Sequence, residues 1–147
     1  KDLRSRGAKA KAARMDTPAP LLASSYVALG GAIGSVLRYQ AGRLLTYLLG
    51  VKAVTTFPWA TLTVNIVGSL AMGLLAGWLA RSGAGGEQYR LFFGVGVLGG
   101  FTTFSAFSLE NMQLLRAGSY ATAAIYILIS IAACIAASFL GFKLLNN

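Results

Sequence analysis

Four long apolar stretches, separated by short polar segments, define the pattern of this chain. They cover residues 21–49, 57–80, 91–109 and 117–142, with short loops at 50–56 and 81–90. A helix of about 20 apolar residues crosses the hydrocarbon core of a bilayer, so each stretch is long enough to span it. We therefore predict an all-α membrane protein with four transmembrane helices.

The third stretch contains, at its centre, a sequence that weakens a helix. Gly99 and Gly100 are followed by several hydroxyl side chains and by Phe104 and Phe107. Each glycine costs a helix roughly 1 kcal/mol relative to alanine, and the hydroxyls compete for backbone hydrogen bonds. Freed backbone groups persist in a membrane only where protein or water receives them, and broken helices are where ion sites are usually built. We predict a broken third helix that forms an ion site; a kink that packs against small neighbours is the alternative.

Two other spans carry aligned polar side chains. In the second span, Thr61, Asn65 and Ser69 recur at intervals of four residues and lie on one helix face. In the fourth span, polar residues recur at 122, 126, 130, 134 and 138. Such side chains often bond a neighbouring helix or their own backbone. The two stripes therefore indicate either the wall of a polar path or a buried seam between helices.

The composition excludes most enzymatic chemistry. Of the 147 residues, 56% are hydrophobic and 12% are charged, whereas soluble domains contain roughly 25% charged residues. The chain has no histidine, four carboxylates and a single cysteine, Cys134. These residues do not provide a multi-cysteine metal site, an intrachain disulfide or an acid–base pair for hydrolysis. We expect an integral membrane protein that is not an enzyme.

The net charge of +9 is divided between a tail and the helix ends. Residues 1–20 form a basic tail, expected to be a flexible appendage, which we interpret as a cytoplasmic arm, a targeting segment or a non-native extension. Residues 21–147 form one membrane domain. Its basic residues lie at helix ends, where they face lipid headgroups, so we expect no nucleic-acid partner.

The loop charges outside the tail are nearly balanced. One side carries Arg81, Arg90 and Lys143 against Glu87; the other carries Arg43, Lys52 and Arg116. The positive-inside rule therefore gives little preference for one orientation. A chain that inserts both ways can pair with itself, and we predict an antiparallel, dual-topology homodimer.

Arg38 lies near the far end of the first span. It is interpreted either as an interfacial side chain that reaches the lipid headgroups or as a vestibule charge that attracts anions. The third span ends on the same side of the membrane, so Glu110 lies at a similar depth and a pairing with Arg38 is reasonable.

The membrane interior offers neutral donors in place of charged groups. A full positive charge at the centre would hold an anion too tightly for conduction, whereas neutral donors can strip its water and release it. Such donors favour a small, hard anion, and the carbonyls of a broken helix suit a bare cation such as Na⁺. The candidate donors are the Asn65 amide, the hydroxyls of Thr102, Thr103, Ser105, Ser108, Tyr126 and Ser130, and the ring edges of Phe104 and Phe107.

Three motifs resemble those of the Fluc-type bacterial fluoride channels, also called the CrcB family. They are the run from Gly31 to Arg38, the sequence Asn65-Ile-Val-Gly, and the run from Gly99 to Glu110. The last is highly specific, and the resemblance extends over residues 21–147. It implies an antiparallel homodimer in the bacterial inner membrane, with two pores for passive fluoride export and with membrane lipid around it. The basic tail is the one departure from the family pattern.

The resemblance also implies roles for individual residues. Phe104 and Phe107 would present ring edges to fluoride, and Asn65 would donate a hydrogen bond to it. Tyr126 and Ser130 would continue the polar track, and Arg38 would lie at the entrance. A central Na⁺ would be held by the backbone carbonyls of Gly99 and Thr102 from both subunits.

Two other classes of protein fit parts of the pattern. A small multidrug exchanger also uses four helices and a dual-topology dimer, but proton-coupled exchange favours a carboxylate deep in the membrane. The first, second and fourth spans contain none, and Glu110 is at the end of the third. A purely structural subunit would assemble but would carry no ion flux.

Overall fold

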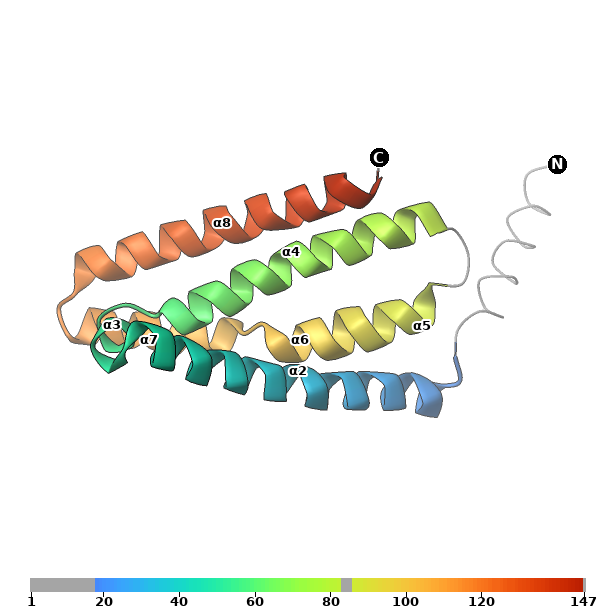
Figure 1. Cartoon of the computed structure of the whole chain (residues 1–147), viewed down its shortest axis with the longest axis horizontal. Helices are drawn as coiled ribbons and strands as arrows, with labels where there is room; N and C mark the ends of the chain where they lie inside the picture. Colours follow the sequence, from blue (N-terminus) through green and yellow to red (C-terminus); the bar gives the residue numbers. More distant parts are fainter. Residues whose placement is uncertain (1–17, 83–85, 147) are drawn as a thin grey trace.

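The computed structural model describes residues 18–82 and 86–146, and it confirms four long apolar helical segments (Figure 1). The first is α2 (Pro20–Leu49), the second α4 (Trp59–Ser82) and the fourth α8 (Tyr120–Asn146). Each is long and apolar enough to cross a membrane. Most of the predicted basic tail lies outside the described residues.

The segment between the first two spans is a short helix, α3 (Val51–Thr56), where the sequence analysis predicted a loop. Its hydroxyls explain the difference, because Thr55 and Thr56 bond carbonyls one turn earlier instead of opening the backbone. The α3 helix lies at the same end of the molecule as α7 (Phe104–Arg116) (Figure 1).

The third span is built from four elements in sequence: α5 (Glu87–Tyr89), the π-helix η1 (Arg90–Leu98), α6 (Gly99–Phe101) and α7. Thr102 and Thr103, which lie between α6 and α7, have extended backbone dihedrals. Gly99 and Gly100 are helical, so the predicted weak point at the glycines is displaced to the two threonines. The segment also continues to Arg116, beyond the predicted end at residue 109.

The helices pack mainly as two pairs (Figure 1). The α4 and α8 helices run side by side, and α2 packs along η1 and α6. The buried apolar core is small and comprises Leu62, Val64, Ala123 and Tyr126. Large apolar side chains therefore cover much of the outer surface, as expected where lipid or a second membrane protein replaces water.

Glycines allow α2 to approach η1 and α6 closely. A side chain at Gly34 of α2 would overlap the backbone carbonyl of Val97 in η1, and one at Gly100 would lie 2.6 Å from the carbonyl oxygen of Gly31. Small residues at such contacts are the usual means by which membrane helices gain packing energy. Gly100 is therefore explained by helix–helix contact, although its sequence suggested a break.

We predict that Gly34→Ala destabilises the fold, whereas Gly31→Ala, one turn earlier, does not. The methyl group at residue 34 meets backbone, whereas the one at residue 31 meets nothing within 4 Å. Overpacking costs about 1–3 kcal/mol, and alanine otherwise favours a helix. Thermal unfolding of both variants in detergent checks this, and equal midpoints would contradict the packing assignment.

Candidate ion pathway

The Asn65 side chain binds the third span at the point where its helix is interrupted. Its Oδ1 accepts a hydrogen bond from the backbone N–H of Thr103 at 2.8 Å, and its Nδ2 donates to the carbonyl oxygen of Thr103 at 3.1 Å. One amide therefore satisfies both backbone groups of an extended residue, as a neighbouring strand would. Unpaired, each of these groups would cost several kcal/mol inside a membrane.

This pairing also changes the neighbouring backbone. In a continuous helix the N–H of Thr103 would bond the carbonyl of Gly99 four residues earlier. Here that N–H is bound to Asn65, and among the described residues no donor to the Gly99 carbonyl is found. Gly99 is exposed, so its carbonyl is available to an external partner.

The hydroxyl of Thr103 begins the next helix. It accepts a hydrogen bond from the backbone N–H of Ala106 at 3.2 Å, which makes Thr103 the N-cap of α7. An N-cap of this kind stabilises a helix start by about 1 kcal/mol. The buried Thr103 therefore fixes where α7 begins and, with it, where Phe104 and Phe107 lie.

A groove of about 330 Å³, here called the polar groove, runs past the interruption. It is lined by Asn65, Thr102, Thr103, Phe104, Phe107 and Ser130, together with Gly68, Ser69, Met72, Ile131, Cys134 and Ser138. Every polar group in this lining is uncharged. The groove therefore unites the stripe of the second span, the interruption of the third and the ladder of the fourth.

The Ser130 hydroxyl is buried and has no hydrogen-bond partner among the described residues. A buried hydroxyl without a partner has given up its hydrogen bonds to water and gained none in return, which costs free energy. Because Ser130 lines the polar groove, a ligand or water that enters the groove can recover that energy. The position is therefore suited to transient binding.

Aromatic rings form a continuous series beside the groove. The ring of Phe104 lies 5.4 Å from that of Phe107, and Phe107 lies 5.1 Å from Tyr126, measured between centroids. Tyr126 is fully buried, whereas Phe104 is 78% exposed. The positively polarised ring edges at the Phe104 end are thus open to a partner outside this chain.

Glu110 binds two hydroxyls that the sequence analysis did not connect with it. Its carboxylate accepts hydrogen bonds from Thr61 Oγ1 at 2.6 Å and from Tyr126 Oη at 2.7 Å. The structure therefore pairs Glu110 with these hydroxyls and not with Arg38, whose Nη1 lies 3.5 Å from the carbonyl oxygen of Thr102. The placement of Thr61 on the polar stripe was the one sequence signal for this cluster.

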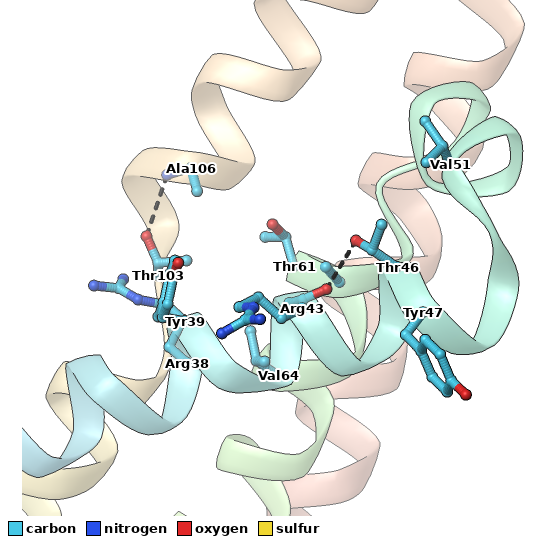
Figure 2. Close-up of a pocket in the computed structure, with 12 residues that line it drawn as sticks. Arg38, Tyr39, Arg43, Thr46, Tyr47, Val51, Thr61, Val64, Thr103 and Ala106 are labelled. Atoms are coloured by element: carbon cyan, nitrogen blue, oxygen red, sulfur yellow. Dashed lines mark hydrogen bonds between the residues drawn. The ribbon is translucent and has the colours of Figure 1, made fainter.

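A second cavity, of about 770 Å³, also has Thr103 in its lining and is here called the arginine cavity (Figure 2). Arg38 and Arg43 of α2 line it, together with Thr61 and Thr103. Thr103 also lines the polar groove. The buried Thr103 thus belongs to both linings, one of which contains two arginines and the other only uncharged groups.

The remaining predicted site residue, Ser108, lies elsewhere. It is exposed, lies outside both linings, and its hydroxyl donates to the carbonyl of Phe104 in the preceding turn at 2.9 Å. The structure therefore brings together around Thr103 the predicted residues at 38, 65, 102, 104, 107 and 130. Tyr126 lies outside both linings, where its ring contacts Phe107 and its hydroxyl binds Glu110, and Ser108 lies on the outer face of α7.

Comparison with known proteins places this arrangement in a family. Residues 25–142 match the family model described as CrcB-like protein, Camphor Resistance (CrcB). A protein of Novosphingobium aromaticivorans named fluoride-specific ion channel FluC is 56% identical over 127 residues, which cover 86% of this chain and 98% of the relative. A protein of the same name from Erythrobacter litoralis is 53% identical over 131 residues, covering 88% and 96%. The chain is a multi-pass membrane protein that belongs to the CrcB-like family.

Proposed function

We propose that this protein is a channel that lets fluoride cross the bacterial inner membrane passively and selectively. The observation that carries the proposal is the polar groove, whose donors are all neutral. The relatives named as fluoride-specific channels support the same assignment. A neutral path binds a dehydrated anion strongly enough to admit it and weakly enough to release it.

The proposed contacts follow from the lining. Asn65 has two N–H groups on Nδ2, and one of them is used by Thr103. The second can donate to fluoride, as can the unpartnered hydroxyl of Ser130. The edges of Phe104 and Phe107 add weak attraction without a fixed charge. These groups favour fluoride over chloride because the smaller ion accepts stronger hydrogen bonds.

We further propose that two copies pair in antiparallel orientation, with the interrupted third spans facing each other. The balanced loop charges support insertion both ways. The exposed Phe104 ring and the exposed Gly99 support a partner surface at the interruption. A second copy would cover these groups and complete two pathways related by symmetry.

A Na⁺ ion between the two copies fits one of its two predicted ligands well. Gly99 is an exposed residue, and its carbonyl has no donor among the described residues. Among the described residues, the donor found for the Thr102 carbonyl is Arg38 at 3.5 Å, a long hydrogen bond. Two carbonyls from each copy would hold the ion, which would neutralise their dipoles at the centre of the dimer.

The proposed function predicts fluoride efflux from vesicles that contain the purified protein. Vesicles loaded with potassium fluoride should release it rapidly when valinomycin carries the K⁺, as followed with a fluoride-selective electrode. Vesicles loaded with potassium chloride should retain chloride because the larger ion accepts weaker hydrogen bonds from the same donors. Equal efflux of both anions, or proton-coupled drug transport in place of fluoride efflux, would contradict the proposal.

Replacing both rings, in Phe104→Ile with Phe107→Ile, should reduce fluoride efflux by about 30-fold. This estimate takes about 1 kcal/mol for each lost ring contact and about 1.36 kcal/mol for each tenfold change. Phe139→Ile is the matched control, because that ring is exposed on α8 and lies outside the groove. An undiminished flux in the double variant would show that the two rings do not contribute to the pathway.

Replacing Asn65 should impair both conduction and stability. Asn65→Ala leaves the N–H and the carbonyl of Thr103 without their partner, at a cost of several kcal/mol for each group inside a membrane, and it also removes a donor to fluoride. Ser69→Ala, one turn along the same stripe, should cause a smaller loss of both. Fluoride efflux and thermal unfolding of the two variants test this, and equal effects would mean that the stripe only packs helices.

A further inference from the structure

A second arginine, Arg43, lines the arginine cavity, and the pathway proposed above does not use it. Arg43 follows Arg38 by five residues on α2, so the two lie about 7.5 Å apart along the helix axis. Both side chains line the cavity (Figure 2). Within the part of the chain that the structure describes, twelve residues line the cavity, and none of them carries a carboxylate.

The charge of Arg43 is not cancelled by a nearby anion. Its guanidinium carbon lies 5.9 Å from the centroid of the Tyr39 ring, a cation–π contact that leaves the positive charge in place. Within residues 18–82 and 86–146, the ion pair found is Glu87 with Arg90, on the opposite side of the membrane domain. Arg43 therefore keeps a full charge at the cavity wall.

The Arg43 charge decides the net charge of the arginine cavity because Glu110 lies behind the cavity wall. Thr61 lines the cavity and donates to the Glu110 carboxylate, which places one negative charge directly behind the wall. Arg38 alone would balance Glu110 and leave the cavity with no net charge. With Arg43 included, two positive charges face one negative charge, so the cavity attracts anions.

We infer that the charge of Arg43 concentrates hydrated anions in the arginine cavity before they reach Thr103. The inference rests on the proposed function. The cavity volume of about 770 Å³ is many times the roughly 30 Å³ that one water occupies in the liquid, so a hydrated anion has room there. The cavity therefore collects small anions without selecting among them. Selection between anions takes place in the smaller polar groove.

The expected change in local anion concentration follows from the distance between the charge and the ion and from screening by salt. A unit charge about 8 Å from an ion in water changes the local concentration of that ion about twofold. At about 1 M ionic strength the Debye length is about 3 Å, and the effect is lost; at about 10 mM it is about 30 Å, and the effect is nearly complete. The contribution of Arg43 should thus depend on salt, unlike a packing contribution.

The test compares fluoride efflux at two ionic strengths for the wild-type protein and three variants. Initial rates are measured from vesicles at about 1 mM fluoride, in about 10 mM or about 1 M potassium isethionate as the inert salt. Arg43→Gln should halve the rate at low salt and leave it unchanged at high salt. Arg43→Lys should retain the wild-type rate at both salt concentrations because it keeps the charge.

Lys52→Gln is the matched control, since Lys52 is exposed on α3 at the same end of the molecule but lies outside the cavity lining. It should leave both rates unchanged. An equal loss in Lys52→Gln would assign the effect to general surface charge and overturn the inference. A loss in Arg43→Gln that is the same at both salt concentrations, or no loss, would also overturn it.

The wild-type rate separates this inference from the proposed function. If the wild-type protein releases no fluoride, the proposed function fails and the inference fails with it. If the wild-type protein releases fluoride and Arg43→Gln matches it at low salt, the inference alone fails.

Discussion

The pair of hydrogen bonds between the Asn65 amide and the backbone of Thr103 is the constraint on which the rest of the site depends. Within a membrane, an extended residue in the middle of a helix is stable only if another group binds its N–H and its carbonyl. Asn65 does both from the neighbouring helix. The Gly99 carbonyl, the N-cap of α7 and the positions of Phe104 and Phe107 all follow from that contact.

The chemistry around the interruption is graded from charged to neutral. The arginine cavity has the larger volume and is lined by two arginines, whereas the polar groove is smaller and contains amide, hydroxyl and ring-edge donors. Thr103 belongs to both, so an anion that passes it exchanges water for weak protein contacts. The Glu110 carboxylate lines neither space and accepts hydrogen bonds from Thr61 and Tyr126.

The sequence predicted the four helices because long charge-free stretches leave a chain few alternatives in a membrane. It also predicted that Asn65, Phe107 and Ser130 share a site, because each belongs to a regular stripe or a specific motif. It placed the irregularity of the third span within residues 99–108 but did not separate the glycines from the threonines, since a glycine pair signals both a break and a close helix contact. Gly100 serves the second purpose, and only the position of α2 reveals this. The binding of Glu110 by Thr61 and Tyr126 was likewise hidden, because it depends on how α4, α7 and α8 are rotated about their axes.

The most direct test of this account is a measurement of the backbone of the third span in a lipid bilayer. Carbon-13 chemical shifts of residues 98–108 in the labelled protein, measured by solid-state nuclear magnetic resonance, report helical or extended conformation residue by residue. The account predicts extended shifts at Thr102 and Thr103, with helical shifts at Phe101 and Ser105. Uniformly helical shifts through both threonines would contradict it.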